Sequence, residues 1–136
     1  MDTVSKEKRS EIMRAVKSKD SQVELTVRRM LHRAGFRYRL HVAVLPGKPD
    51  LVFPVRRKAI FIHGCFWHLH KNCRAARRPS SNVEYWESKL QRNAERDMDN
   101  RRKLKALGWK TLVVWECELK NPEAVFSALT RFLKMT

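Results

Sequence analysis

The spacing of apolar residues predicts two helices at the start of the chain. In residues 5–17, apolar positions recur at helical spacing among many basic ones, which leaves a short helix with a thin apolar face. In residues 21–34 the apolar positions recur at i+3 and i+4, and Gly35 stands where a left-handed C-terminal cap is expected. Ser21 and Glu24 have the spacing of a capping box at the start of this second helix.

In the middle of the chain the pattern changes to one that predicts strands. Residues 36–40 alternate between apolar and basic, which predicts a half-exposed strand. Residues 50–53 and 59–62 are apolar runs and predict two buried strands, joined through residues 54–58 as a hairpin. Residues 63–80 are irregular and dense in His, Cys and Arg.

The last third of the chain predicts a helix, a strand and a helix. The long helix covers residues 82–107, with the capping-box pair Ser81 and Glu84 at its start. Residues 109–115 are apolar on both faces, which favours a central strand. Asn121-Pro122 has the N-cap and first-turn residues of a final helix. The order of elements predicts an α/β sandwich around a mixed sheet.

Length and charge narrow the class of protein. A chain of 136 residues fits one domain. Thirty Lys and Arg against fourteen Asp and Glu give a net charge of +16, so a polyanion is the natural partner. Nucleic acid is the leading candidate, because each neutralised phosphate releases counterions; the alternative is a basic surface with no dedicated ligand. The sequence has neither a membrane-spanning run nor a secretory signal at its charged start, so we expect a cytoplasmic protein without a membrane partner.

Residues 63–73 read HGCFWHLHKNC, which is a candidate metal site. They hold two of the three cysteines and three of the five histidines, and the remaining cysteine follows the strand predicted over residues 109–115. Thiolate and imidazole donors suit a structural, four-ligand Zn²⁺ site. The predicted ligands are Cys65, Cys73, Cys117 and one histidine, with His70 favoured and His68 also within reach. The alternative is three buried apolar cysteines and solvated histidines.

A carboxylate beside this segment is a candidate Mg²⁺ ligand. Asp50 opens an apolar strand, and the predicted hairpin brings it close to His63. A carboxylate oxygen near a phosphate suits Mg²⁺, whereas the simpler interpretation is a solvated side chain. Asn93 and Asp97 interrupt the apolar stripe of the long helix, as either a satisfied buried network or an active-site wall. If His70 ligates zinc, His68 stays available for proton transfer.

With these residues in view, the sequence resembles the very short patch repair endonucleases. The matching pieces, in family order, are RSxxMRAV (residues 9–16), LPGKPD (45–50), FIHGCFWH (61–68), EYW (84–86), NAERD (93–97) and LGW…VVWEC (107–117). The resemblance implies a restriction-endonuclease-like core and Mg²⁺-dependent nicking of one DNA strand beside a T·G mismatch. It also implies a monomer, acting alongside a cytosine-C5 methyltransferase and mismatch-repair factors. The competing hypotheses are a nuclease of other specificity and a zinc-stabilised DNA-binding module without catalysis.

The resemblance also implies roles for single residues. Asp50 and the backbone carbonyl of Ile62, which stands where relatives commonly have Thr, would hold Mg²⁺. His68 would be the general base, oriented by Asp97, with His63 at the scissile phosphate and Glu24 at the edge of the site. Cys65, His70, Cys73 and Cys117 would bind Zn²⁺. Phe66, Trp67, Trp86 and Met13 would form a wedge beside the mismatch, although core packing is the ordinary role of such aromatics. The N-terminal helix within residues 1–20 would close over the DNA, with phosphate contacts from Lys6, Arg9, Arg14 and Lys17.

Overall fold

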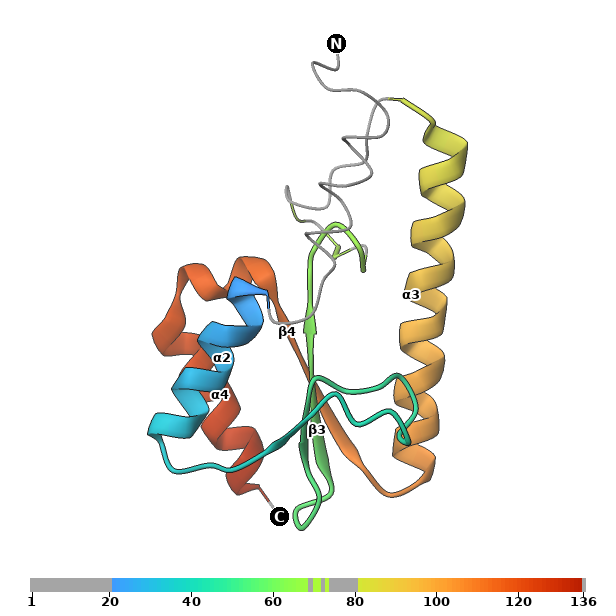
Figure 1. Cartoon of the computed structure of the whole chain (residues 1–136). Coiled ribbons are helices and arrows are strands. Elements are labelled where there is room, and N and C mark those ends of the chain that lie inside the picture. Colours follow the sequence, from blue (N-terminus) through green and yellow to red (C-terminus); the bar gives the residue numbers. More distant parts are fainter. Residues whose placement is uncertain (1–20, 69, 72, 74–80, 136) are drawn as a thin grey trace.

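A computed structural model describes residues 21–68, 70–71, 73 and 81–135 (Figure 1). The basic helix predicted over residues 5–17, with its phosphate-binding residues and Met13, therefore lies outside the described residues. The described elements are α2 (Gln22–Arg33), β1 (Arg39–Leu40), β2 (Leu51–Phe53), β3 (Lys58–His63), α3 (Val83–Ala106), β4 (Lys110–Trp115), the 3₁₀ helix η2 (Glu116–Lys120) and α4 (Pro122–Lys134).

The four described strands form one mixed sheet in the order β1-β2-β3-β4. The β1–β2 and β2–β3 pairs are antiparallel, which confirms the predicted hairpin, and β3 runs parallel to β4. In the β3–β4 register His63 lies opposite Trp115, so both strands end at the same edge of the sheet. The predicted mixed α/β architecture is confirmed.

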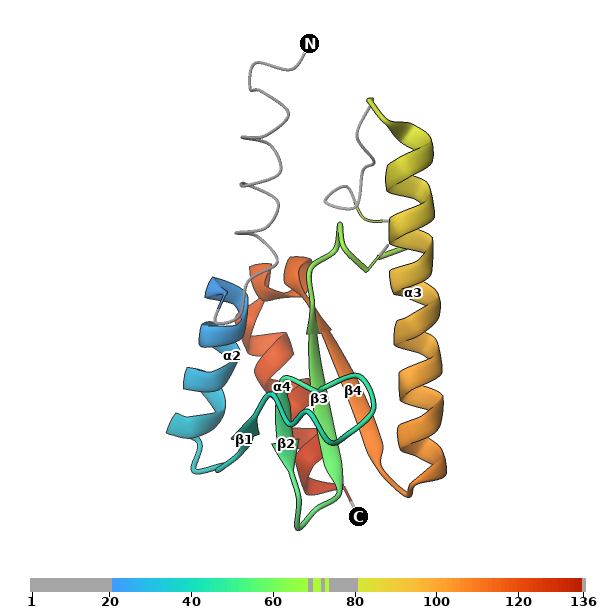
Figure 2. The same ribbon diagram turned by 45° about the vertical axis from the view of Figure 1, so that its right-hand side comes forward.

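Helices lie on both sides of this sheet (Figures 1 and 2). Helices α2 and α4 cover one side and pack on β2, β3 and β4, with Leu31, Ile60 and Leu129 fully buried between them. The long helix α3 lies on the opposite side, where Leu90 and Leu104 are fully buried. Because β3 alternates, Ile60 contributes to the α2/α4 core while His63 approaches Asp97 of α3. The side chain of His63 therefore lies on the side of the sheet that α3 covers.

Helix capping follows the sequence in two of three helices. The Ser21 hydroxyl accepts a hydrogen bond from the Glu24 N–H at 3.3 Å, and Asn121 accepts one from Ala124 at 3.3 Å. Helix α3 starts later than the Ser81 capping box predicts. Its N-cap is Asn82, in a left-handed conformation with φ 53° and no capping bond from its side chain.

Two strand predictions need correction. The strand predicted over residues 36–40 is only two residues long, because Phe36 and Tyr38 pack on the core before pairing begins, and the Tyr38 hydroxyl donates to the Arg28 carbonyl of α2. Strand β4 is an edge strand of the described sheet and not a central one. Its residues are apolar on both faces because helices cover both sides of the sheet.

Lys58 links the start of β3 to the end of α4 through hydrogen bonds. The sequence predicted this residue in the turn before the strand. Its side chain is buried, and Nζ donates to the carbonyl oxygens of Phe132 at 2.5 Å, Leu133 at 3.2 Å and Met135. Carbonyls in the last turn of a helix lack partners within the helix, so a buried ammonium there satisfies several of them. Burial lowers the pKa of Lys58, and the cations of Lys110 and Arg56 lower it further.

Candidate active site and metal cluster

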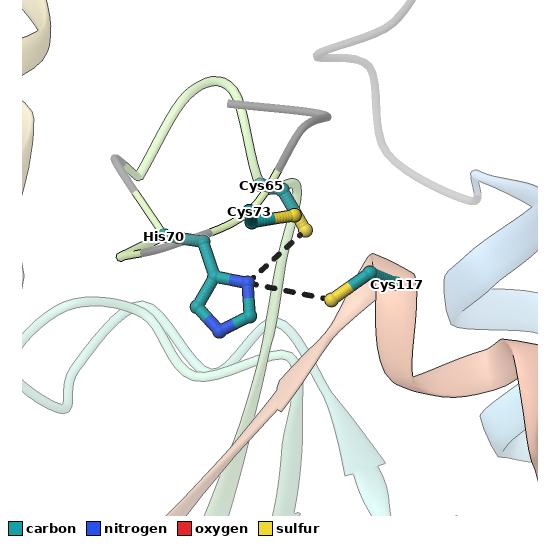
Figure 3. A group of neighbouring side chains, drawn as sticks. All are labelled: Cys65, His70, Cys73 and Cys117. Carbon is teal, nitrogen blue, oxygen red and sulfur yellow. Dashed lines mark hydrogen bonds between the residues drawn. The ribbon is translucent and has the colours of Figure 1, made fainter. Parts of the chain in front are cut away.

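Three thiols and one imidazole meet at the sheet edge where β3 and β4 end (Figure 3). The donor atoms of Cys65, His70, Cys73 and Cys117 all lie within 4.8 Å of one another. His70 Nδ1 is 3.5 Å from Cys65 Sγ and 3.4 Å from Cys117 Sγ. The parallel register explains the meeting, because Cys65 and Cys117 each follow by two residues the pair His63 and Trp115.

The chemistry of this donor set fits Zn²⁺. Burial raises the pKa of Cys65 to about 12; a backbone hydrogen bond at Cys117 opposes this rise, and the side chains of Cys117 and Cys73 add to it. A buried thiol becomes a thiolate only when a cation compensates it, and a tetrahedral Cys₃His set is a common environment for that cation. In the structure His70 belongs to this cluster, whereas His68 lies beside His63 and Asp97. The structure therefore favours His70 as the histidine of the cluster, a choice that the sequence left open between His70 and His68.

His68 pairs with Asp97 of α3. Its Nδ1 contacts the Asp97 carboxylate, and its ring stacks on His63 with centroids 3.8 Å apart. A carboxylate at Nδ1 favours the tautomer in which that nitrogen carries the proton, so the Nε2 lone pair is free to accept one. His63 is 3% exposed, and burial together with the charge of His68 lowers the pKa of His63 to about 3. His63 therefore stays neutral.

Asp50 is fixed by the backbone of the neighbouring strand. Its Oδ2 accepts a hydrogen bond of 2.7 Å from the Ile62 N–H. Burial raises the pKa of Asp50 to about 7; the Ile62 hydrogen bond and the Arg28 charge oppose that shift, and Glu24 adds to it. A carboxyl group with this pKa exchanges its proton for a metal ion near neutral pH.

Glu24 and His41 form a network with Asp50 at the start of α2. His41 Nε2 lies 3.2 Å from Glu24 Oε1, and His41 Nδ1 lies 3.9 Å from Asp50 Oδ1. Arg28 binds the other Glu24 oxygen at 2.8 Å and approaches His41 Nε2 at 3.2 Å. The sequence interpretation missed His41 and Arg28. Pairing of residues 39–40 with 51–52 places His41 opposite Asp50, so the strand register is the signal that identifies His41.

One cavity joins the Asp50 network to the His68–Asp97 pair. It has a volume of about 460 Å³ and is lined, among others, by Glu24, His41, Asp50, His63, His68 and Asp97. Lys48 and, from η2, Glu116 also line it. Carboxylates and an imidazole with a free lone pair thus face one space, which is the arrangement that hydrolysis assisted by a metal ion needs.

The aromatic residues of the predicted wedge gather beside the start of α3. Phe66, Trp67 and Trp86 pack edge to face, with ring centroids 5.2 to 6.0 Å apart. Trp67 is 5% exposed and Trp86 is 9% exposed, whereas Phe66 is only half-buried. Asn93 donates to the Trp67 carbonyl at 3.5 Å, which attaches the loop after β3 to α3.

Trp115 links the thiol cluster to the His63–His68 stack. Its ring lies parallel to that of His70, with centroids 4.1 Å apart, and contacts His63 edge-on at 5.0 Å. The sequence interpretation gave Trp115 no role beyond its strand. Its position follows from the parallel pairing with His63 and is visible only once that register is known.

The fold and site together define a class of protein: an α/β protein with a thiol-rich cluster that could hold a metal ion, beside a cavity lined by carboxylates and histidines. Comparison with known proteins identifies its family, since the family described as DNA mismatch endonuclease Vsr matches residues 1–75. The Type II nicking enzyme V.XorIIP of Xanthomonas oryzae pv. oryzae is 45% identical over 132 residues, 97% of this chain and 96% of that protein. The DNA mismatch endonuclease Vsr of Escherichia coli is 40% identical over 134 residues, 98% of this chain and 85% of that protein. The chain belongs to the DNA mismatch endonuclease Vsr family.

This membership confirms the resemblance on which the sequence interpretation relied. A third relative, the Type II nicking enzyme V.NmeAIP of Neisseria meningitidis, is 41% identical over 133 residues, 98% of this chain and 94% of that protein.

Among the described residues, no helix combines the length and the apolar character that crossing a membrane requires.

Proposed function

We propose that this protein is a Mg²⁺-dependent endonuclease that nicks one strand of duplex DNA beside a T·G mismatch. The observation that carries the proposal is the shared cavity, which Asp50 and the His68–Asp97 pair both line. Membership in the DNA mismatch endonuclease Vsr family supports a nuclease over a binding module. Two relatives named as nicking enzymes support a single-strand cut.

Asp50 and the backbone carbonyl of Ile62 would hold the Mg²⁺ ion. When bound, the ion offsets the negative charge that develops on the phosphate. His68 accepts the proton of the attacking water at Nε2, because Asp97 occupies its Nδ1. Asp97 then stabilises the imidazolium that forms. His63 contacts the scissile phosphate. Burial keeps its imidazole neutral, so it does not repel the imidazolium that forms at His68.

The thiol cluster would serve as a structural Zn²⁺ site. Zn²⁺ at Cys65, His70, Cys73 and Cys117 fastens the loop that carries His68 to the end of β4. We place this site in a single domain with a restriction-endonuclease-like core. Four protein ligands leave no open position on the ion, so it stabilises the loop and takes no part in the hydrolysis.

The Phe66, Trp67 and Trp86 cluster would act as the wedge beside the mismatch. Unstacking a base step costs a few kcal/mol and less at a mispair, so an aromatic wedge discriminates against paired DNA. The half-buried Phe66 is the member placed to enter the duplex, while the two buried tryptophans support it. Met13, with Lys6, Arg9, Arg14 and Lys17, would approach from the N-terminal segment.

A nicking assay on matched duplexes tests the proposal. Two duplexes that differ only in T·G against T·A are incubated with the zinc-loaded protein, with Mg²⁺ or with none added. We expect a nick in the T·G duplex with Mg²⁺ and at least a ~100-fold slower cut of the T·A duplex. Equal rates on both duplexes would show a nuclease of other specificity.

A pair of aspartate variants separates catalysis from binding. Asp50→Ala should lose nicking and keep most of its DNA affinity, because Asp50 holds the ion and not the duplex. Asp99→Ala is the matched control, since Asp99 is on α3 and pairs only with Arg102 and Lys103 among the described ion pairs. If Asp50→Ala nicks at the rate of Asp99→Ala, Asp50 does not hold the catalytic ion. If Asp99→Ala binds the duplex but does not nick it either, a binding module remains.

A further inference from the structure

The geometry around His41 resembles that of a metal ligand more than that of a surface histidine. Its side chain is only 16% exposed and lies between two carboxylates. The 3.2 Å from Nε2 to Glu24 Oε1 is within hydrogen-bond distance, whereas the 3.9 Å from Nδ1 to Asp50 Oδ1 is too long for a hydrogen bond. Two donors that bind one ion at ~2 Å each lie at most ~4 Å apart, so the second distance suits a shared cation.

The other bonds of the two carboxylates orient them toward His41. Asp50 Oδ2 accepts from the Ile62 N–H, and Glu24 Oε2 accepts from Arg28. Asp50 Oδ1 and Glu24 Oε1 are the oxygens nearest the imidazole nitrogens, and a side-chain hydrogen bond between Glu24 and Asp50 keeps the two carboxyl groups together. One donor atom from each of Glu24, His41 and Asp50 lies within 4.8 Å of the others.

The backbone at His41 supports the same interpretation. His41 has φ 48°, a left-handed conformation that costs energy for a residue with a side chain. A hydrogen bond of 3.2 Å from the His41 N–H to the Asp50 carbonyl holds it there. Strain of this kind persists where surrounding structure fixes it, and here it aims the imidazole at Asp50 and not at solvent.

We propose that His41 Nδ1 is a ligand of the ion at Asp50 and that Glu24 positions His41 by accepting the Nε2 proton. The proposal deepens the proposed function, because it concerns the ion bound at Asp50. Arg28 also approaches Nε2, and a cation at Nδ1 selects the tautomer whose Nε2–H points to Glu24. A nitrogen donor favours a transition-metal ion over Mg²⁺, so Mn²⁺ binds this site more tightly than Mg²⁺.

Pulsed electron paramagnetic resonance of Mn²⁺ tests this ligand directly. The zinc-loaded full-length protein is given one equivalent of Mn²⁺, and the spin-echo modulation is recorded. We expect modulation from one directly bound ¹⁴N nucleus in the unmodified protein and none in His41→Gln. His32→Gln is the matched control, because His32 is exposed on the same helix as Glu24 and should leave the modulation unchanged.

Affinities provide the second measurement. Mn²⁺ affinity should fall about tenfold in His41→Gln, while Mg²⁺ affinity should fall less than about threefold. Modulation that persists in His41→Gln, or that is absent from the unmodified protein, would overturn the assignment. An equal loss of Mn²⁺ and Mg²⁺ affinity would also overturn it, because the variant would then have disturbed Asp50 rather than removed a nitrogen ligand.

The two proposals fail separately. A protein that shows the nitrogen modulation and leaves the T·G duplex intact keeps the His41 assignment and refutes the proposed nicking beside T·G mismatches. A protein that nicks the T·G duplex and shows no nitrogen modulation keeps the nuclease and refutes the assignment.

Discussion

The affinity of the protein for Mg²⁺ should depend steeply on pH, because a proton and the ion compete for Asp50. Burial raises the pKa of this carboxyl from 3.8 to about 7 in the metal-free protein. Raising the pH through 7 removes the proton and exposes the charge that the ion needs. Mg²⁺ binding should therefore strengthen as the pH rises and weaken as it falls.

The size of the effect follows from the ionised fraction of the carboxyl. With a pKa of about 7, roughly ten elevenths of the protein is ionised at about pH 8 and one eleventh at about pH 6. The apparent dissociation constant should therefore rise about tenfold between these two conditions. A carboxyl with the ordinary pKa of 3.8 is ionised at both, so its affinity would stay constant.

Isothermal titration calorimetry of the zinc-loaded protein measures both the affinity and the protons released. Repeating each titration in two buffers of different ionisation enthalpy gives the number of protons displaced, which should be about one half at pH 7. The His41→Gln variant is titrated in parallel, because any dependence on pH that it retains cannot come from that imidazole. A constant affinity from pH 6 to pH 8 in both proteins would refute the inferred pKa of Asp50.

Three further substitutions test separate parts of the account. Asp97→Asn should slow nicking by at least ~100-fold with unchanged zinc content, because His68 loses the carboxylate acceptor at Nδ1. The control Asp99→Asn should nick at the normal rate. Equal rates for the two variants would contradict the orienting role of Asp97. Cys117→Ser should lower the zinc content and lower the thermal midpoint by at least ~5 °C, as measured by metal analysis and calorimetry, and full zinc occupancy would contradict the proposed ligand set. Lys58→Met should reduce the free energy of unfolding in urea by about 2 kcal/mol, because the last turn of α4 loses a charged donor, while Lys105→Met, an exposed control on α3, should change it little. Equal stability of these two variants would contradict the role assigned to Lys58.

Most of the secondary structure could be predicted because local patterns determine it. The hairpin between β2 and β3 followed from two apolar runs flanking a short turn, and the start of α4 followed from Asn121-Pro122. The extent of β1 could not be predicted, because Phe36 and Tyr38 alternate like strand residues but pack on the core before pairing begins. The position of a strand within the sheet also depends on contacts between residues far apart in the sequence. The sequence pattern of β4 therefore predicted a central strand, although β4 lies at the edge of the described sheet.

In the candidate site, too, some contacts could be predicted from the sequence and others depended on the three-dimensional structure. Cys65 and Cys117 could be brought together from the sequence, because a parallel pair of strands ends at one edge. The choice between His68 and His70 needed coordinates, since it depends on how the loop after β3 turns. His41 was missed because its partner Asp50 is nine residues away and becomes a neighbour only through the β1–β2 register.

We propose that His68, oriented by Asp97 and excluded from the thiol cluster, removes a proton from the water that attacks the phosphate. This role can be tested by single-turnover nicking of a T·G duplex with the His68→Ala variant. We expect a rate at least ~100-fold lower, partly restored by added imidazole, with zinc content and DNA affinity unchanged. A rate within a factor of about two of the unmodified protein would refute this role, because the reaction would then not need the His68 imidazole.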